Sequence, residues 1–330
     1  MLQTHFGRKI FSIHFHPECN PFCRKFSLRL SLLATSGIPC RMDETQLVHD
    51  AAISRGTPVI TASRCTAASA LKAHWLEYLM ESGELGFFMV SACSFTTLFE
   101  YPGSPVNAWL PSAFARQALG GLAMALTLLL LIHSAWGKRS GAHMNPAMTL
   151  MFLRLGKMEP WDGLFYAGSQ FAGGLAGVAV SSLVIGSALA HPKVNFAATE
   201  PGMWGASTAF VAELLISFLL ATAVLVTSND KRLSRFTPYF AATLVAAYIT
   251  FEAPFSGMSM NPVRTLGSAI PAHAFHGLWI YFTAPPLAML IAAELYLRVR
   301  SARAVYCAKL NHNNAARCIF RCRYMELQGN

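Results

Sequence analysis

Long apolar runs recur along the chain, separated by short polar segments. Six of them cover residues 76–99, 119–136, 163–189, 205–228, 236–251 and 277–293. A helix needs about 20 predominantly apolar residues to cross the hydrocarbon core of a bilayer. Hydrophobic residues make up 54% of the 330-residue chain and charged residues only 13%. The pattern therefore predicts an all-α membrane protein with six transmembrane helices.

Two further apolar segments are too short to cross a bilayer, and each begins with an Asn-Pro pair. The pairs lie in Asn145-Pro146-Ala147 and in Asn261-Pro262-Val263. Asparagine is a good helix N-cap and proline fits the first helical position, so each pair predicts a helix start. A helix of about ten residues is about 15 Å long, half of the hydrocarbon core. Irregular backbone at that depth must line protein or a wet cavity, so two half-helices predict a pore or binding site near the midplane.

The order of these segments repeats. A span with a glutamate, a second span, a short Asn-Pro helix and a third span occur at about residues 73–190 and again at about 205–300. Glu81 and Glu213 hold matching places at the starts of the two copies. Three spans are an odd number, so the second copy enters the membrane from the opposite side. The sequence predicts an inverted three-helix repeat whose two re-entrant half-helices meet end to end.

The first span carries three glutamates on one helix face. Glu77, Glu81 and Glu84 recur at the spacing of neighbouring helical turns. A carboxylate within a membrane is costly unless it faces the protein interior. We expect Glu81, Glu84 and Glu213 to be structural, with Glu81 and Glu84 accepting hydrogen bonds from loop N–H groups.

Positive charge is distributed unevenly between the loops. If both termini are cytoplasmic, 23 of the 26 Lys and Arg residues are inside, and only Arg116, Lys193 and Arg264 are outside. This asymmetry follows the positive-inside rule. It predicts a multi-pass protein with both termini in the cytoplasm, and we expect the membrane to be the plasma membrane or a bacterial inner membrane. It also accounts for the net charge of +10 without a nucleic-acid partner.

The two ends of the chain differ from the spans in composition. Residues 1–72 have no sustained periodicity and are predicted to be a disordered, basic cytoplasmic extension. Residues 73–300 form the predicted membrane domain, and residues 301–330 form a basic cytoplasmic tail that contains cysteines. Four tail residues have the spacing C-x4-H-x5-C-x3-C, namely Cys307, His312, Cys318 and Cys322. They are a candidate zinc set, although palmitoylated or idle cysteines are the alternative, and no cofactor is expected elsewhere.

Several of these residues match one known family. The segment Ser140-Gly-Ala-His-Met-Asn-Pro-Ala147, the second box ending in Arg264, and the glutamates Glu81 and Glu213 resemble the duplicated Asn-Pro-Ala boxes of the major intrinsic proteins, or aquaporins. Gln170 in the third span is another matching landmark. The resemblance covers about residues 75–300, and two boxes in register with a duplicated six-span order make it specific.

The resemblance implies a single-file pore through each subunit of a homotetramer embedded in the lipid bilayer. Asn145 and Asn261 would donate hydrogen bonds to the passing solute, while the two helix dipoles would oppose protons and cations. Arg264 would line an outer constriction, and His143 would help to pack the first loop. An enzyme is not expected, because the spans contain no catalytic constellation.

Two departures from the family pattern bear on the substrate. Val263 replaces the alanine of the second box, and the junction of the half-helices is expected to repack around its two extra methyl groups. Thr265 stands where the glycerol-conducting members typically have aspartate, which favours the water branch.

Counting back from the two boxes places the rest of the outer selectivity filter. The positions beside Arg264 are Ala125, Ile249 and Met258. Because these side chains are small or apolar, they predict a wider and less polar constriction than that of a strict water channel. The resulting prediction is a passive channel for water and small neutral solutes. A glycerol or small-solute facilitator, a non-conducting structural membrane protein and, more weakly, an ion-coupled transporter are the alternatives.

Overall fold

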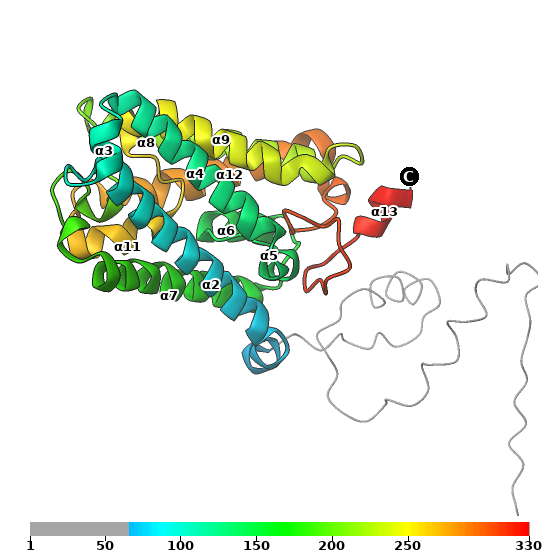
Figure 1. Ribbon diagram of the computed structural model, residues 1–330. Helices are drawn as coiled ribbons and strands as arrows, with labels where there is room; N and C mark the ends of the chain where they lie inside the picture. The colour runs from blue at the N-terminus through cyan, green and yellow to red at the C-terminus, as the bar shows by residue number, and fades with distance from the viewer. Residues whose placement is uncertain (1–65, 330) are drawn as a thin grey trace, which may run out of the picture. The chain divides into compact units, whose positions relative to one another are not determined.

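The computed structural model describes residues 66–329, which form helices and loops without a strand. The long helices are α2 (Ala67–Glu100), α4 (Ala113–His133), α7 (Pro160–Ile185), α8 (Gly205–Ser228), α9 (Thr237–Phe251) and α12 (Leu278–Arg300). Each of them coincides with most of one predicted span. Figure 1 shows them side by side in a bundle.

Two short helices lie inside the bundle, as the Asn-Pro pairs predict. They are α6 (Pro146–Arg154) and α11 (Pro262–Ala272), and both are visible between the long helices in Figure 1. The Asn145 side chain accepts a hydrogen bond from the N–H of Ala147, and the Asn261 side chain accepts one from the N–H of Val263. The remaining short elements are α3 (Pro105–Trp109), α5 (Ala135–Ser140), η3 (Gly186–Ala188), η4 (Asn195–Ala197), η5 (Ser234–Phe236), α10 (Ala253–Ser256), η6 (Ala302–Ala304) and α13 (Tyr324–Gly329).

The first helix starts earlier than its apolar run. Thr66 caps α2 through a reciprocal capping box with Ser69, so the helix begins at Ala67. Lys72 and His74 interrupt the hydropathy of this first part, which hid it from a pattern of apolar positions. The predicted extension 1–72 is therefore too long by about six residues, and residues 1–65 lie outside the described part of the chain.

The predicted span 119–136 is two helices rather than one. Ser134 ends α4, and its side chain accepts a hydrogen bond from the N–H of Gly137 to cap α5. Helix α4 also begins six residues before the predicted span, at Ala113. Hydropathy continues across Ser134, so only the cap geometry reveals the break.

Small residues allow α2 and α7 to cross closely. A Cβ atom added to Gly173 would lie 1.9 Å from the carbonyl oxygen of Ser82, and one added to Gly177 would lie 2.4 Å from that of Gly86. No larger side chain fits at either position, so Gly173 and Gly177, four residues apart, allow the close helix crossing.

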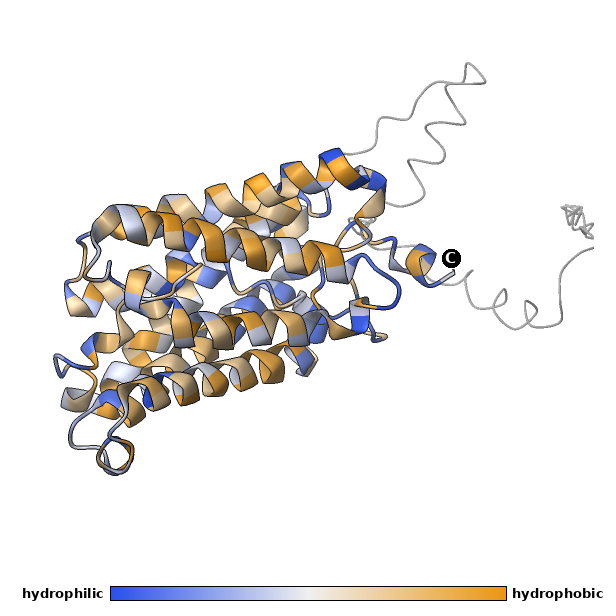
Figure 2. Ribbon diagram, turned by 90° about the horizontal axis from the view of Figure 1, so that it is seen from above, coloured by the Kyte–Doolittle hydropathy of each residue, from blue (hydrophilic) through white to orange (hydrophobic). Residues whose placement is uncertain are grey.

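The outer faces of the long helices are apolar. Figure 2 shows hydrophobic residues along the bundle and hydrophilic ones concentrated in its loops and ends. Among the described residues, α4, α8, α12 and the segment Pro160–Ala188 are long and apolar enough to span a membrane on those criteria alone. Helix α9 has only 15 residues, and α2 contains four glutamates, of which Glu100 is at its C-terminal end. Glu77, Glu81 and Glu84 are buried, so the polar face of α2 is turned inward.

Candidate functional site

The loops that precede the two half-helices have the same backbone conformation. At equal distances before Asn145 and Asn261, the backbone takes positive φ angles at Gly141 (102°), Ala142 (56°) and Met144 (48°), and at Gly257 (78°), Met258 (52°) and Met260 (54°). Positive φ is unfavourable for residues other than glycine and persists only where the surroundings enforce it. The repeated strain indicates two equivalent loops that are held by equivalent contacts.

Two buried glutamates hold these loops. Glu81 accepts hydrogen bonds from the N–H groups of His143 (2.8 Å) and Met144 (2.7 Å). Glu213 does the same for Ser259 (2.6 Å) and Met260 (2.7 Å). The carboxylates thus bind backbone donors, the arrangement that we predicted for Glu81.

Hydroxyl groups complete both loops. Glu84 accepts from the hydroxyl of Ser140 at 3.0 Å, so the prediction that it binds backbone N–H groups is wrong. The hydroxyl of Tyr166 donates to the Ser140 carbonyl at 2.6 Å, and that of Tyr281 donates to the Ser256 carbonyl at 2.5 Å. These tyrosines on α7 and α12 extend the correspondence between the two halves to the third helix of each.

The two asparagines are joined by reciprocal contacts. The amide of Asn145 donates to the carbonyl of Met260 at 2.7 Å, and the amide of Asn261 donates to the carbonyl of Met144 at 2.7 Å. Each side chain therefore caps its own half-helix with its oxygen and bonds the opposite loop with its nitrogen. The N-termini of α6 and α11 meet at this point.

A cavity of about 610 Å³ runs past the paired asparagines. Its wall includes residues of α2, α4 and α9 at helical spacing, among them Phe88, Ala92, Phe95, Phe99, Gln117, Gly120, Met124, Leu128, Ala241, Val245 and Ile249. Asn145, Asn261 and Arg264 supply polar groups between these apolar side chains. The cavity is thus a mostly apolar passage with hydrogen-bond donors at its middle.

Five of the sequence-predicted site residues line this cavity. They are Asn145, Ile249, Met258, Asn261 and Arg264. Pro146, Ala147, Pro262 and Val263 do not line it, because they form the first turns of the half-helices and pack against neighbouring helices.

Ala125 was the wrong choice for the filter position on α4. It is buried and does not line the cavity, whereas Gln117, Gly120 and Met124 do. The amide of Gln117 donates to the carbonyl of Ile249 at 2.8 Å, which places these two residues at one level. Ala125 lies eight residues further along the helix, about 12 Å away. The count back from Asn145 runs through Ser134, where α4 ends and α5 begins.

Val263 points away from the cavity toward α7. Its side chain is fully buried, and a Cβ atom added to Gly174 would lie 2.4 Å from its Cγ1 atom. The extra methyl groups of valine thus occupy the space that glycine leaves open. The half-helix junction is repacked at α7 and not within the cavity.

Arg264 is held by a loop that the sequence did not single out. Its guanidinium donates to the carbonyl of Ala197 at 2.9 Å. Asn195, Phe196 and Ala197 all have positive φ angles, which turn the loop toward Arg264. Positive φ at residues other than glycine leaves no clear mark in a sequence, so nothing in the chain marked Ala197.

The other end of the cavity is bounded by the C-terminal tail. Leu310 lines the cavity together with Ala142 and His143. The Nε2 atom of His143 lies 2.8 Å from the carbonyl oxygen of Ala308, and the N–H of Leu310 donates to the carbonyl of Gly141 at 3.2 Å. The tail is therefore packed on the first loop, which the sequence did not predict.

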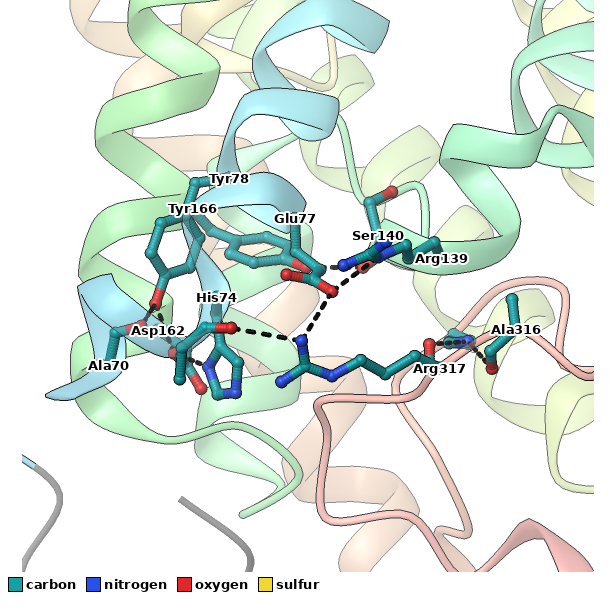
Figure 3. A network of polar contacts seen from close by, with 12 residues as sticks. Ala70, His74, Glu77, Tyr78, Arg139, Ser140, Asp162, Tyr166, Ala316 and Arg317 are labelled. Carbon is teal, nitrogen blue, oxygen red and sulfur yellow. Dashed lines mark hydrogen bonds and ion pairs between the residues drawn. The ribbon is translucent and has the colours of Figure 1, made fainter. Parts of the chain in front are cut away.

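Charged residues anchor the tail beside α2. Figure 3 shows Arg317 of the tail and Arg139 of α5 converging on Glu77. Their nitrogens lie 3.6 Å and 2.8 Å from the Glu77 carboxylate, which is fully buried. In the same region Asp162 accepts from the hydroxyl of Tyr78 at 2.6 Å. Glu77 is thus an internal ion-pair partner that joins α2, α5 and the tail.

Comparison with known proteins identifies a family with similar sequences. The family model described as "Major intrinsic protein" matches residues 84–296. Aquaporin NIP6-1 of Arabidopsis thaliana is 35% identical over 188 residues, which cover 56% of this chain and 59% of that protein. Aquaporin A of Dictyostelium discoideum is 31% identical over 188 residues, which cover 55% of this chain and 66% of that protein. The chain thus spans less than two thirds of the length of these curated relatives.

A solved structure has the same fold. The X-ray structure of the aquaglyceroporin from Plasmodium falciparum aligns with a TM-score of 0.56 at 19% identity, covering 70% of this chain and 98% of that one. The match of the family model over most of the membrane domain agrees with the paired half-helices and the cavity between them. The chain therefore belongs to the major intrinsic proteins, the aquaporin family of non-enzymatic, multi-pass membrane channels.

Proposed function

We propose that this chain is a passive channel for water and small neutral solutes that excludes protons and ions. The reciprocal asparagine pair carries the proposal. Each amide nitrogen has two hydrogens and spends one on the opposite loop, so one N–H of Asn145 and one of Asn261 remain for a solute oxygen. The positive ends of two helix dipoles meet at the same place and oppose a cation or a proton chain.

The cavity wall supports passage of solutes larger than water. Ile249, Met258 and Gly120 give the wall apolar or small side chains, with Gln117 and Arg264 as polar groups. The apolar part of this wall can contact the carbon atoms of a neutral solute, while the polar groups bind its oxygen atoms. A cation would lose its hydration beside Arg264 and the positive ends of the two half-helices without a matching countercharge.

The buried carboxylates favour passive flow over coupled transport. Glu81 and Glu213 are engaged by loop N–H groups and do not line the cavity. A coupled transporter needs a membrane carboxylate that can exchange a proton or an ion with the pathway. The described cavity wall contains Glu100 and Glu200, both outside the middle of the bundle.

The proposal also covers orientation and assembly. We place the tail and both termini in the cytoplasm, because that end holds nearly all of the Lys and Arg residues. We also propose a homotetramer in the plasma membrane or a bacterial inner membrane. Large exposed apolar side chains such as Leu130, Leu183 and Leu215 provide surface for lipid and for neighbouring subunits.

Stopped-flow light scattering on proteoliposomes of the full chain tests the proposal. We expect shrinkage in an impermeant osmolyte to be faster than in empty liposomes, and re-swelling in a glycerol gradient to be faster too. Asn261→Asp should reduce both rates, because a carboxylate cannot donate to a solute. Gln328→Glu is the control, because it also replaces a side-chain amide by a carboxylate but at an exposed position of α13.

Three other outcomes separate the alternatives. Fast shrinkage with glycerol entry at the rate of empty liposomes would restrict the channel to water. Fast glycerol entry with slow shrinkage would indicate a solute facilitator. Rates equal to those of empty liposomes would contradict conduction and favour a structural role on the same fold.

A further inference from the structure

Four residues of the C-terminal tail bring their ligand atoms together, and we call them the tail cluster: Cys307, His312, Cys318 and Cys322. Their three sulfurs and one imidazole nitrogen all lie within 4.8 Å of one another. The sulfurs of Cys307 and Cys318 are 3.5 Å apart, and the sulfur of Cys322 is 3.0 Å from Nε2 of His312. The residues are spread over 16 positions of a loop, so the fold of the tail collects them.

The distances fit one tetrahedral metal ion. Zinc binds sulfur at about 2.3 Å, which separates two sulfurs of a tetrahedral site by about 3.8 Å. Three thiolates and one imidazole form a common closed set for structural zinc, and soft sulfur ligands disfavour calcium and magnesium. Cys307 is buried and the other three residues are half-buried, so an ion could enter and would then be enclosed.

Two buried lysines beside the cluster give an independent indication. Lys309 and Lys157 are only 2% and 6% exposed. The ammonium of Lys309 donates to the carbonyls of Lys138 (2.7 Å), Arg317 (2.8 Å) and Ala316 (3.1 Å). Among the described residues, no carboxylate lies within ion-pair distance of either lysine. Buried charges normally have a partner, and a zinc ion with three thiolates carries the net negative charge that would supply one.

We propose that the tail cluster binds one Zn²⁺ ion and that this ion holds the tail over the end of the cavity lined by His143 and Leu310. The ion joins Cys307 and His312, which flank Ala308 and Leu310, to Cys318 and Cys322, which flank Phe320. These intervening residues contact Gly141 and His143 in the loop before α6. The ring of Phe320 stacks on that of His143 with 5.3 Å between centroids. The ion would therefore act as a clamp that holds both segments of the tail on that loop.

Zinc binds cysteine as the thiolate, so binding of the ion would release the protons of the three thiols.

Metal analysis of the full chain tests the site without reference to conduction. After purification in detergent with reductant and added Zn²⁺, followed by desalting, we expect about one zinc per chain. Co²⁺ in place of zinc should give the intense visible bands of tetrahedral thiolate coordination. The double variant Cys318→Ser, Cys322→Ser and the single variant His312→Gln should lose both signals. Cys93→Ser and His276→Gln remove a cysteine and a histidine outside the cluster and should retain them.

Two results would overturn the metal site. One is substoichiometric zinc in the unaltered chain, or zinc that does not change in the cluster variants. The other is a thiol titration under non-reducing conditions that finds Cys307 and Cys318 joined in a disulfide in the cellular form of the protein. Either result leaves the proposed channel function intact, because the channel measurement uses different residues.

The clamp itself is tested by proteolysis and permeability. Chelating the zinc should speed tryptic cleavage at Arg317, Arg321 and Arg323 and should raise the water permeability of proteoliposomes. The cluster variants should show fast cleavage and high permeability with or without the chelator. Unchanged cleavage after zinc removal would overturn the clamp. Faster cleavage after zinc removal, with no water permeability in the zinc-bound or the zinc-free protein, would support the clamp. That result would contradict the proposed channel function but not the metal site.

Discussion

The two Asn-Pro boxes differ at one position, with Ala147 in the first and Val263 in the second. Both side chains are buried and turned away from the cavity. Valine fits because Gly174 of α7 faces it without a Cβ atom. The replacement of alanine by Val263 in the second box thus affects helix packing and not the cavity wall.

We expect Gly174→Ala to destabilise the protein by about 1–3 kcal/mol, because the new methyl group would overlap Val263. Adding Val263→Ala should recover most of this loss, since it removes the opposing atoms. Thermal unfolding in detergent measures both effects. Gly168→Ala, on the same helix with nothing within 4 Å of the added carbon, should be neutral or slightly stabilising. Equal losses in the single and double variants would contradict direct contact between the two positions.

The residues that carry a strong local rule could be predicted from sequence. Asn145 and Asn261 cap helices whatever their surroundings, and Arg264 follows at fixed distance along one of those helices. Ala125 depended on counting through a segment that contains a helix break, and the prediction failed there. Ala197 and Leu310 reach the site from distant parts of the chain, and no spacing rule relates them to it.

At the scale of elements, the half-helices depend on loops that are strained in the same way. Each loop has left-handed residues immediately before its asparagine, and one glutamate binds two of its N–H groups. The strain of several non-glycine residues at positive φ costs about 1–3 kcal/mol each. The buried carboxylate compensates for this cost in both halves.

Replacing either carboxylate by an amide should therefore weaken the fold similarly. In Glu81→Gln or Glu213→Gln one acceptor oxygen becomes a donor that faces a backbone N–H, at a cost of about 3 kcal/mol. Glu294→Gln is the control, because Glu294 is 43% exposed and pairs with Arg154 at the surface, where a pair contributes about 1 kcal/mol or less. Melting temperatures of the three variants measure these effects, and we expect similar decreases for the two buried positions and little change for Glu294→Gln. A loss confined to one of the two buried glutamates would contradict the equivalence of the loops.

Element boundaries were less predictable than element identity. In the described part of the chain, the apolar runs identified the six long helices and the Asn-Pro pairs identified both half-helices. The start of α2 at Ala67 and the break at Ser134 depend on side-chain caps that hydropathy does not register. Polar residues such as Lys72 belong to helices here because the helix extends beyond its apolar part.

At the scale of the whole molecule, the tail connects parts of both halves. The N–H of Tyr306 donates to the side-chain oxygen of Asn229 in the loop after α8, and the N–H of Arg321 donates to the carbonyl of Lys157 in the loop before α7. Composition alone described this segment as basic and rich in cysteine. Its packing depends on a few long-range contacts that the pattern of apolar positions does not contain.

Lys309 tests how firmly the tail is seated. In Lys309→Met the carbonyls of Lys138, Ala316 and Arg317 lose their buried donor, and we expect about 1–3 kcal/mol of local destabilisation. Tryptic cleavage of the tail should become faster, although one cleavage site has been removed. Lys231→Met, at an exposed position in the loop after α8, should leave the rate of tail cleavage unchanged. A protected tail in the Lys309 variant would show that other contacts suffice.

The crossed bonds between Asn145 and Met260, and between Asn261 and Met144, make the pore centre also the mechanical joint of the molecule. Neither half can complete its own channel lining alone, since each supplies the carbonyl that orients the other half's amide. Two separately produced halves would thus recognise each other through the same amide groups that we propose bind the solute. We therefore expect a mutation that breaks these bonds to change permeation and assembly together.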